Sequence, residues 1–120
     1  MAGGGMDGRC HCGRATVRLP RQPDSITQCN CSLCSKTGFR GVYFGSEELE
    51  IAGTFDSYIR EDLKQPYLAT HRCAHCGTMT HWTPLSEPPH ERMGVNARLF
   101  DQAMLADIPV NHVDGASWDE

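Results

Sequence analysis

The sequence predicts a mostly β protein of short antiparallel strands with little helix, and three features of the chain support this. Glycine and proline are frequent, with 12 and 7 residues in a chain of 120, and they break the sequence at short intervals, as turns do. The apolar stretches between them are only as long as single strands. Only residues 101–107 (DQAMLAD) have the composition of a helix.

The expected elements, taken in chain order, follow a glycine-rich start. Residues 1–7 are expected to be disordered, and residues 8–120 to form one domain. Ala15, Val17 and Leu19 alternate with polar residues, which predicts a half-buried strand at residues 14–19. Residues 25–28 are expected to form a second strand, which leads into CNCSLC. The segment SLCSKTG (32–38) predicts a turn or a single helical turn. Further strands are expected at residues 39–44, 55–60, 66–72, 78–82 and 91–96.

Charge and hydropathy limit the partners and the compartment. The net charge of −4 and isoelectric point near 5.8 argue against binding to nucleic acid or to an anionic membrane surface. The chain has no apolar run of about 18 residues, and its first residues, MAGGGMDG, lack the features of a secretory signal, so a cytoplasmic location is expected. Thiols stay reduced there, which favours metal ligation by clustered cysteines over disulfides.

The seven cysteines fall into three groups that the chain separates widely. A structural zinc takes four tetrahedral ligands, and two distant cysteine pairs are the usual way to supply them. The two outer groups each end in HCG, where the glycine allows backbone amides to turn toward the sulfurs. We therefore assign one structural zinc to the outer pairs, with one pair being merely buried thiols as the alternative. The proposed ligands are Cys10, Cys12, Cys73 and Cys76.

The middle group, Cys29, Cys31 and Cys34, supplies three ligands and leaves a fourth position. Three protein ligands with an open position are typical of a reactive zinc. Three thiolates make the ion soft, so an incoming thiol suits it better than water. The alternative is a closed site completed by a histidine, with His71, His81, His90 and His112 as candidates.

Cationic side chains stand beside these groups. Two zinc ions and seven thiolates would leave the chain strongly negative, so cations are expected close to the clusters. Lys36 and Arg40 follow the middle group and are candidates to attract an anionic thiol, and Arg9, Arg14 and Arg72 stand beside the outer cysteines. Ordinary solvated side chains are the alternative for each.

Five segments together resemble one known family: GRCHCGRATV, CNCSLCSKTG, HRCAHCGTMTHW, GVNARLFD and VDGASW. The chain resembles the glutathione-dependent formaldehyde-activating enzymes, a family that also contains the centromere protein V domain, from about residue 8 to residue 118. This resemblance implies a beta-tent fold with two Zn²⁺ ions per chain, one structural on the outer four cysteines and one catalytic-type on the middle three.

The resemblance also implies an activity. The family's named reaction joins the thiol of glutathione to formaldehyde and gives S-hydroxymethylglutathione, so a carbon-sulfur lyase acting on a glutathione adduct is expected, with Cys29, Cys31 and Cys34 as catalytic residues. Asn96 and Arg98 match a recurring family stretch and are candidates to bind a carboxylate. The alternative is that they are ordinary charged or polar residues on the surface of a strand. Two other functions stay open: a non-catalytic protein-interaction module and a thiol-redox enzyme.

Overall fold

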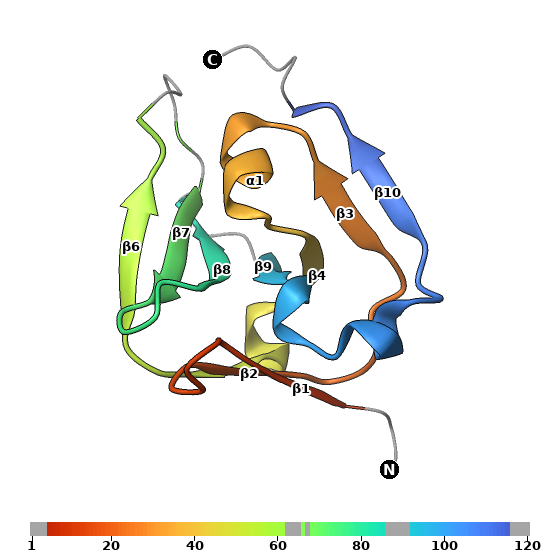
Figure 1. The fold of residues 1–120 in the computed structure, drawn as a ribbon. Coiled ribbons are helices and arrows are strands. Elements are labelled where there is room, and N and C mark those ends of the chain that lie inside the picture. Colours follow the sequence, from red (N-terminus) through yellow and green to blue (C-terminus); the bar gives the residue numbers. More distant parts are fainter. Residues whose placement is uncertain (1–4, 62–65, 67, 86–91, 116–120) are drawn as a thin grey trace.

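The computed structural model describes residues 5–61, 66, 68–85 and 92–115, and this part of the chain forms two β-sheets (Figure 1). The smaller sheet has the order β1-β2-β5, with strands Met6–Arg9, Thr16–Leu19 and Glu50–Ala52. The larger sheet has the order β10-β3-β4-β9-β8-β7-β6, with strands Val110–Val113, Ile26–Cys29, Gly41–Gly45, Arg92–Asn96, Met79–Pro84, Leu68–Cys73 and Phe55–Ile59. The predicted mostly β fold class is confirmed.

The helices in the described residues are all short. The helix α1 covers Ser32–Thr37, directly after β3, and ends at Gly38, whose φ of 77° is in the left-handed region that glycine tolerates. The predicted helical turn at SLCSKTG is thus confirmed. Three 3₁₀ helices cover Ser46–Glu48, Ala97–Leu99 and Gln102–Leu105. None of the described helices is long and apolar enough to cross a membrane.

The larger sheet curls around α1. Figure 1 shows β6 and β7 on one side of the helix and β3 and β10 on the other, with the smaller sheet crossing below. Neighbouring strands are antiparallel except for β3 and β10, which run parallel from Val110 opposite Ile26 to Val113 opposite Cys29. The curl is what lets residues from distant strands face the same helix.

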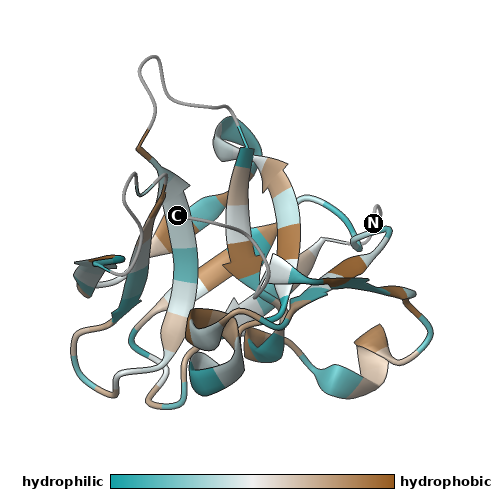
Figure 2. Ribbon diagram, turned by 90° about the horizontal axis from the view of Figure 1, so that it is seen from above, coloured by the Kyte–Doolittle hydropathy of each residue, from teal (hydrophilic) through white to brown (hydrophobic). Residues whose placement is uncertain are grey.

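The main hydrophobic core lies between the two sheets. Val17 and Leu19 on β2 are at most 1% exposed, as is Ala15 just before the strand, which confirms the alternation predicted for residues 14–19. Ala15 packs in a second, smaller cluster with Cys10 and Cys73. Val42 on β4 and Val95 on β9 are buried equally deeply, and Figure 2 shows how hydrophobic and hydrophilic positions alternate along the strands. The core therefore anchors β2 and the centre of the larger sheet.

Three expectations about elements need correction. The disorder expected through residue 7 is wrong for Met6 and Asp7, because they pair with Leu19 and Arg18 in β1, and residues 1–4 lie outside the described part. The helix expected at residues 101–107 is a shorter 3₁₀ helix, Gln102–Leu105, in which the Asp101 carboxylate accepts a hydrogen bond from the Ala103 amide. The strands β5 and β10 were not predicted, and β10 is parallel to its neighbour.

Candidate functional site

The outer four cysteines come together where the two sheets meet. Cys10 and Cys12 lie in the turn after β1, Cys73 ends β7, and Cys76 lies in the turn that follows it. Their four sulfur atoms all lie within 4.8 Å of one another, with 3.6 Å between Cys10 and Cys12 and 3.7 Å between Cys12 and Cys73. The pairing predicted from the spacing is the one that the structure brings together.

The two turns are built alike. Gly13 and Gly77 close them with φ of 83° and 80°, and their amides donate to the carbonyl oxygens of Cys10 and Cys73. Within the turns, backbone amides point at sulfur: Ala15 N lies 3.3 Å from Cys10 Sγ, and Cys76 N lies 3.5 Å from Cys73 Sγ. Amide donors of this kind stabilise thiolates, which suits metal binding.

Electrostatics in the outer cluster favour ionised sulfur at Cys76 and oppose it at Cys12. The hydroxyl and amide of Thr78 lower the pKa of Cys76 to about 5. For Cys12, a backbone hydrogen bond at Arg14 lowers the pKa, but desolvation and the three neighbouring sulfurs outweigh it and raise the pKa to about 11. Four thiols at this spacing cannot all ionise without a cation between them, and the donor set fits a tetrahedral zinc.

The middle three cysteines surround the start of α1. Cys29 ends β3, Cys31 is the N-cap residue of α1, and Cys34 lies in its first turn. Their sulfurs also lie within 4.8 Å of one another. The amide of Cys31 lies 3.5 Å from Cys29 Sγ, and the amide of Cys34 lies 3.4 Å from Cys31 Sγ. This arrangement fits a soft divalent metal held by three thiolates.

The three middle thiols have unequal acidity. Burial opposes ionisation of Cys31, but hydrogen bonds from the Cys34 amide and the neighbouring thiols lower its pKa. Burial and repulsion from the other two sulfurs raise the pKa of Cys34 far above its usual value. A bound cation would remove this repulsion, so the cluster is built to hold positive charge.

No histidine of the described residues completes the middle cluster. His71 binds Ser57 and Thr83 through its two ring nitrogens, at 2.6 and 2.9 Å, and stacks on His81 with ring centroids 4.6 Å apart. His112 is exposed on β10, and His90 lies outside the described residues. Neither metal-ligand group found in the described chain includes a histidine or a carboxylate. Among the described residues, the middle cluster therefore offers a metal three thiol ligands and no histidine.

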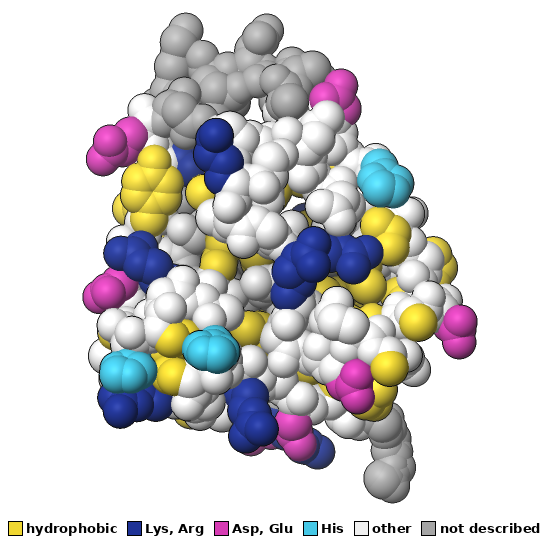
Figure 3. Space-filling view, in the orientation of Figure 1, with side chains coloured by type: hydrophobic (Ala, Val, Ile, Leu, Met, Phe, Trp, Pro, Cys, Tyr) yellow, Lys and Arg dark blue, Asp and Glu magenta, His cyan; other side chains and the backbone are white. Residues whose placement is uncertain are grey.

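The middle cluster opens into a cavity of about 510 Å³ inside the curl of the larger sheet. Its described walls are mainly apolar, with two arginines and two threonines. The lining residues beside the cysteines are Thr27, Leu33, Phe39, Tyr43, Arg60, Leu68, Thr70, Met79, Trp82, Pro84, Arg92 and Val113. Figure 3 shows the face of the molecule that carries α1, with basic side chains across its middle and most acidic ones near its edge. A small anionic thiol suits such a site.

The residues predicted to attract or bind the thiol do not line this cavity. Lys36 is exposed on α1 and lines a smaller hollow with Tyr58 and Arg60. Arg98 is exposed and donates to the carbonyl oxygen of Gly38. Arg40 has a buried Nε without a hydrogen-bond partner and is not among the residues that line the cavity.

Asn96 is held by backbone groups. Its side chain is 3% exposed, its Nδ2 donates to the carbonyl oxygen of Met79 at 2.8 Å, and its Oδ1 accepts from the amide of Arg98 at 3.1 Å. These bonds fix the end of β9, which indicates a structural contribution.

The sequence did not predict the two cationic residues that line the cavity, Arg60 and Arg92. Their neighbours in sequence contain no motif that distinguishes them from surface charges. Arg92 lies over the ring of Tyr43, with 4.6 Å between its guanidinium carbon and the ring centroid. Only the curl of the sheet reveals that both line the same cavity as the cysteines.

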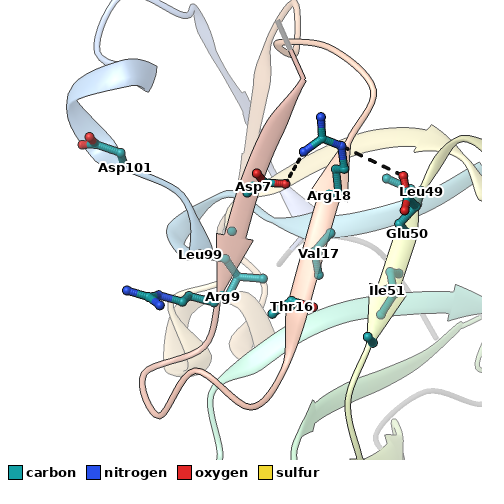
Figure 4. Close-up of a pocket in the computed structure, with 12 residues that line it drawn as sticks. Asp7, Arg9, Thr16, Val17, Arg18, Leu49, Glu50, Ile51, Leu99 and Asp101 are labelled. Atoms are coloured by element: carbon teal, nitrogen blue, oxygen red, sulfur yellow. Dashed lines mark hydrogen bonds and ion pairs between the residues drawn. The ribbon is translucent and has the colours of Figure 1, made fainter.

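A larger hollow, of about 930 Å³, lies on the smaller sheet (Figure 4). Among its charged residues, Arg18 lies 2.6 Å from Asp7 and 4.0 Å from Glu50. No cysteine or histidine of the described chain lines it. Size alone therefore does not make it the functional site.

The fold and the clusters define a small β protein with two cysteine groups of metal-binding geometry, one of them beside a cavity. The chain belongs to the family of glutathione-dependent formaldehyde-activating enzymes, whose sequence model matches residues 5–113. A crystal structure of a protein from Rhodobacter sphaeroides has a similar fold, with a TM-score of 0.67 and 23% identity over 88% of this chain and 100% of that one.

Proposed function

We propose that the protein is a zinc-dependent carbon-sulfur lyase that acts on a glutathione adduct such as S-hydroxymethylglutathione. The observation that carries this proposal is the three-thiol cluster of Cys29, Cys31 and Cys34, which has no further ligand among the described residues and opens into a cavity with two arginines. Family membership supports the same substrate class.

The outer and middle clusters would divide the work between them. The outer cluster of Cys10, Cys12, Cys73 and Cys76 would supply the four ligands of a structural zinc and so tie the two sheets together. Zinc on Cys29, Cys31 and Cys34 would lower the pKa of an incoming thiol and hold its sulfur as a thiolate. The cavity then positions the carbon beside that sulfur, and Arg60 and Arg92 attract the carboxylates of glutathione.

The reaction is an addition without oxidation or reduction. In the forming direction the sulfur-carbon bond forms, the carbonyl π pair moves to oxygen, and that oxygen takes a proton in place of the one that the thiol released. The lyase direction breaks the same bond and returns the thiol and the aldehyde. Holding both partners in one cavity lowers the entropic part of the barrier.

Calorimetry of the zinc-loaded protein tests the thiol site. Glutathione and S-methylglutathione are titrated in two buffers of different ionisation enthalpy. Glutathione should bind with proton release and should bind less well as pH falls, because protons compete with the metal for its sulfur. S-Methylglutathione should bind much more weakly. Equal binding of the two ligands without proton release would refute sulfur coordination.

Metal analysis tests the two-site arrangement independently. Protein purified without chelators should contain two zinc ions per chain by plasma emission spectroscopy. One ion or none would contradict the assignment. A free thiol in the middle cluster would then favour a thiol-redox enzyme.

A further inference from the structure

Two aromatic residues that line the cavity, Tyr43 and Trp82, pack beside a glycine, and we call this pair the floor of the cavity. Gly94 on β9 stands opposite Tyr43 on β4 and opposite Trp82 on β8. The two rings lie 6.0 Å apart between centroids and are tilted by 58°. A Cβ atom on Gly94 would lie 1.9 Å from Trp82 Nε1, so the indole rests directly on the backbone there. The floor therefore depends on the absence of a side chain at Gly94.

The walls around this floor are also apolar, with Leu33, Leu68, Met79 and Val113 among them. The hydroxyl of Thr70 already donates to the carbonyl oxygen of Tyr58 at 3.2 Å. None of the cavity residues in the described chain is acidic, whereas two are arginines. The site thus offers positive charge and apolar surface, and its described lining includes no carboxylate.

Formaldehyde does not use these features. Its carbon carries only hydrogen, and glutathione itself is polar along its length, so neither would cover the aromatic floor. Apolar surface left exposed to water in a binding site gives no favourable free energy, whereas a ligand group covering it does.

We propose that the cavity receives thiol adducts of aldehydes larger than formaldehyde, whose apolar, preferably aromatic, substituent lies on Tyr43 and Trp82. This inference rests on the proposed function, because it requires the adduct's sulfur at Cys29, Cys31 and Cys34. The carbon bonded to that sulfur carries the substituent, and a carboxylate of the same adduct faces Arg92. The chemistry is unchanged: thiol and aldehyde add to give a hydroxyl-bearing carbon bonded to sulfur, or the adduct divides back into the two.

Two small thiols test the inference by calorimetry with the zinc-loaded protein. Mercaptoacetate and α-mercaptophenylacetate share a thiol and a carboxylate, and differ only in whether hydrogen or phenyl stands on the carbon bonded to sulfur. Covering the floor should make the phenyl compound bind at least about tenfold more tightly. Zinc content is measured after each titration, so that loss of metal is not mistaken for binding.

Variants locate the effect. Trp82→Ala removes half of the floor, and Gly94→Ala displaces the indole, so in either variant the advantage of the phenyl compound should shrink to about twofold or less. The same two thiols are titrated into every protein, so the difference in their thiol acidity cancels when the affinity ratio is compared between wild type and variant. Met104→Ala, at an exposed position outside the cavity, should keep the full advantage.

The outcomes separate the two proposals. If both thiols bind wild-type protein equally well, the aromatic-aldehyde inference is overturned while the thiol site stands, and this arm needs no variant to fold. An advantage that survives in a folded Trp82→Ala or Gly94→Ala protein also overturns it. If neither thiol binds, the proposed function itself fails.

Discussion

The sulfur of Cys12 lies 3.7 Å from that of Cys73, although 61 positions separate the two residues in the chain. Cys12 belongs to the turn after β1 in the smaller sheet, and Cys73 ends β7 in the larger one. The apolar cluster at this junction is small, with Ala15 and Phe55 as its members besides cysteines. A metal ion bound by the outer cluster would therefore supply much of what holds the two sheets together here.

Loss of one outer ligand should unfold the protein. Structural zinc contributes on the order of 10 kcal/mol to the folding of small zinc domains, which is comparable with the whole stability of a domain of this size. Cys10→Ser or Cys76→Ser should therefore abolish the cooperative thermal transition, as followed by circular dichroism.

The matched control for this prediction is Cys31→Ser in the middle cluster. Serine is a good N-cap residue, so α1 should keep its start, and the protein should remain folded with one zinc ion. Equal melting temperatures for the Cys10, Cys31 and Cys76 variants would contradict the division into a structural and a reactive site.

Much of the candidate site could be predicted because its residues are close in sequence. The spacing of Cys29, Cys31 and Cys34 is short enough that one turn into a helix brings the three sulfurs together. The outer cluster joins two similar turns, and the repeated HCG made the pairing recognisable. The strand of Ala15, Val17 and Leu19 was predictable because one of its faces is buried and the other is not.

The rest depends on contacts between distant strands. The strand Val110–Val113 has little alternation of its own, and it forms because it pairs in parallel with β3. The cavity arises from the curl of the seven-stranded sheet, so Arg60 and Arg92 could not be told from solvated charges. Lys36 was favoured because it follows the cysteines in sequence, but the helix carries it to an exposed position.

Asn96 should matter for stability more than for ligand binding. Asn96→Ala removes the hydrogen bonds to Met79 and Arg98, which are partly buried, and leaves those backbone groups without this partner. The free energy of unfolding in urea should fall by about 1–3 kcal/mol. Arg98→Ala, at an exposed side chain, should cost less than about 1 kcal/mol. Normal stability of Asn96→Ala together with weakened glutathione binding would instead support the carboxylate-binding role expected from the sequence.

Arg92 should contribute to the affinity for anionic thiols. It lines the cavity and is held over the Tyr43 ring, so its charge stands close to a bound ligand. Arg92→Met should weaken mercaptoacetate binding about threefold to tenfold, and the loss should diminish at high salt. Binding of the uncharged 2-mercaptoethanol should change little. Lys36→Met is the matched control, and an effect as large as that of Arg92→Met would show that position in the cavity does not decide the contribution.

His81 should make the protein less stable in mild acid. Its side chain is 6% exposed, and burial together with the neighbouring His71 lowers its pKa to about 4 from the ordinary 6.5. Between these two values the unfolded chain binds a proton at His81 that the folded chain does not. Stability is therefore complete above about pH 6.5 and is lost as pH falls toward 4, by about 1 kcal/mol at pH 5.5 and about 3 kcal/mol at pH 4.

His81→Asn isolates this effect, because asparagine does not titrate and can still bond to the Thr80 hydroxyl, which lies 2.8 Å from His81 Nδ1. Urea unfolding is measured at pH 7.5 and 5.5 with excess zinc, so that any acid-induced weakening of metal binding affects both proteins alike. The variant should be less stable at pH 7.5 because it packs less well against Phe55. Between the two pH values it should lose about 1 kcal/mol less than the wild type. Parallel losses in the two proteins would show that the acid sensitivity does not arise at the buried His81.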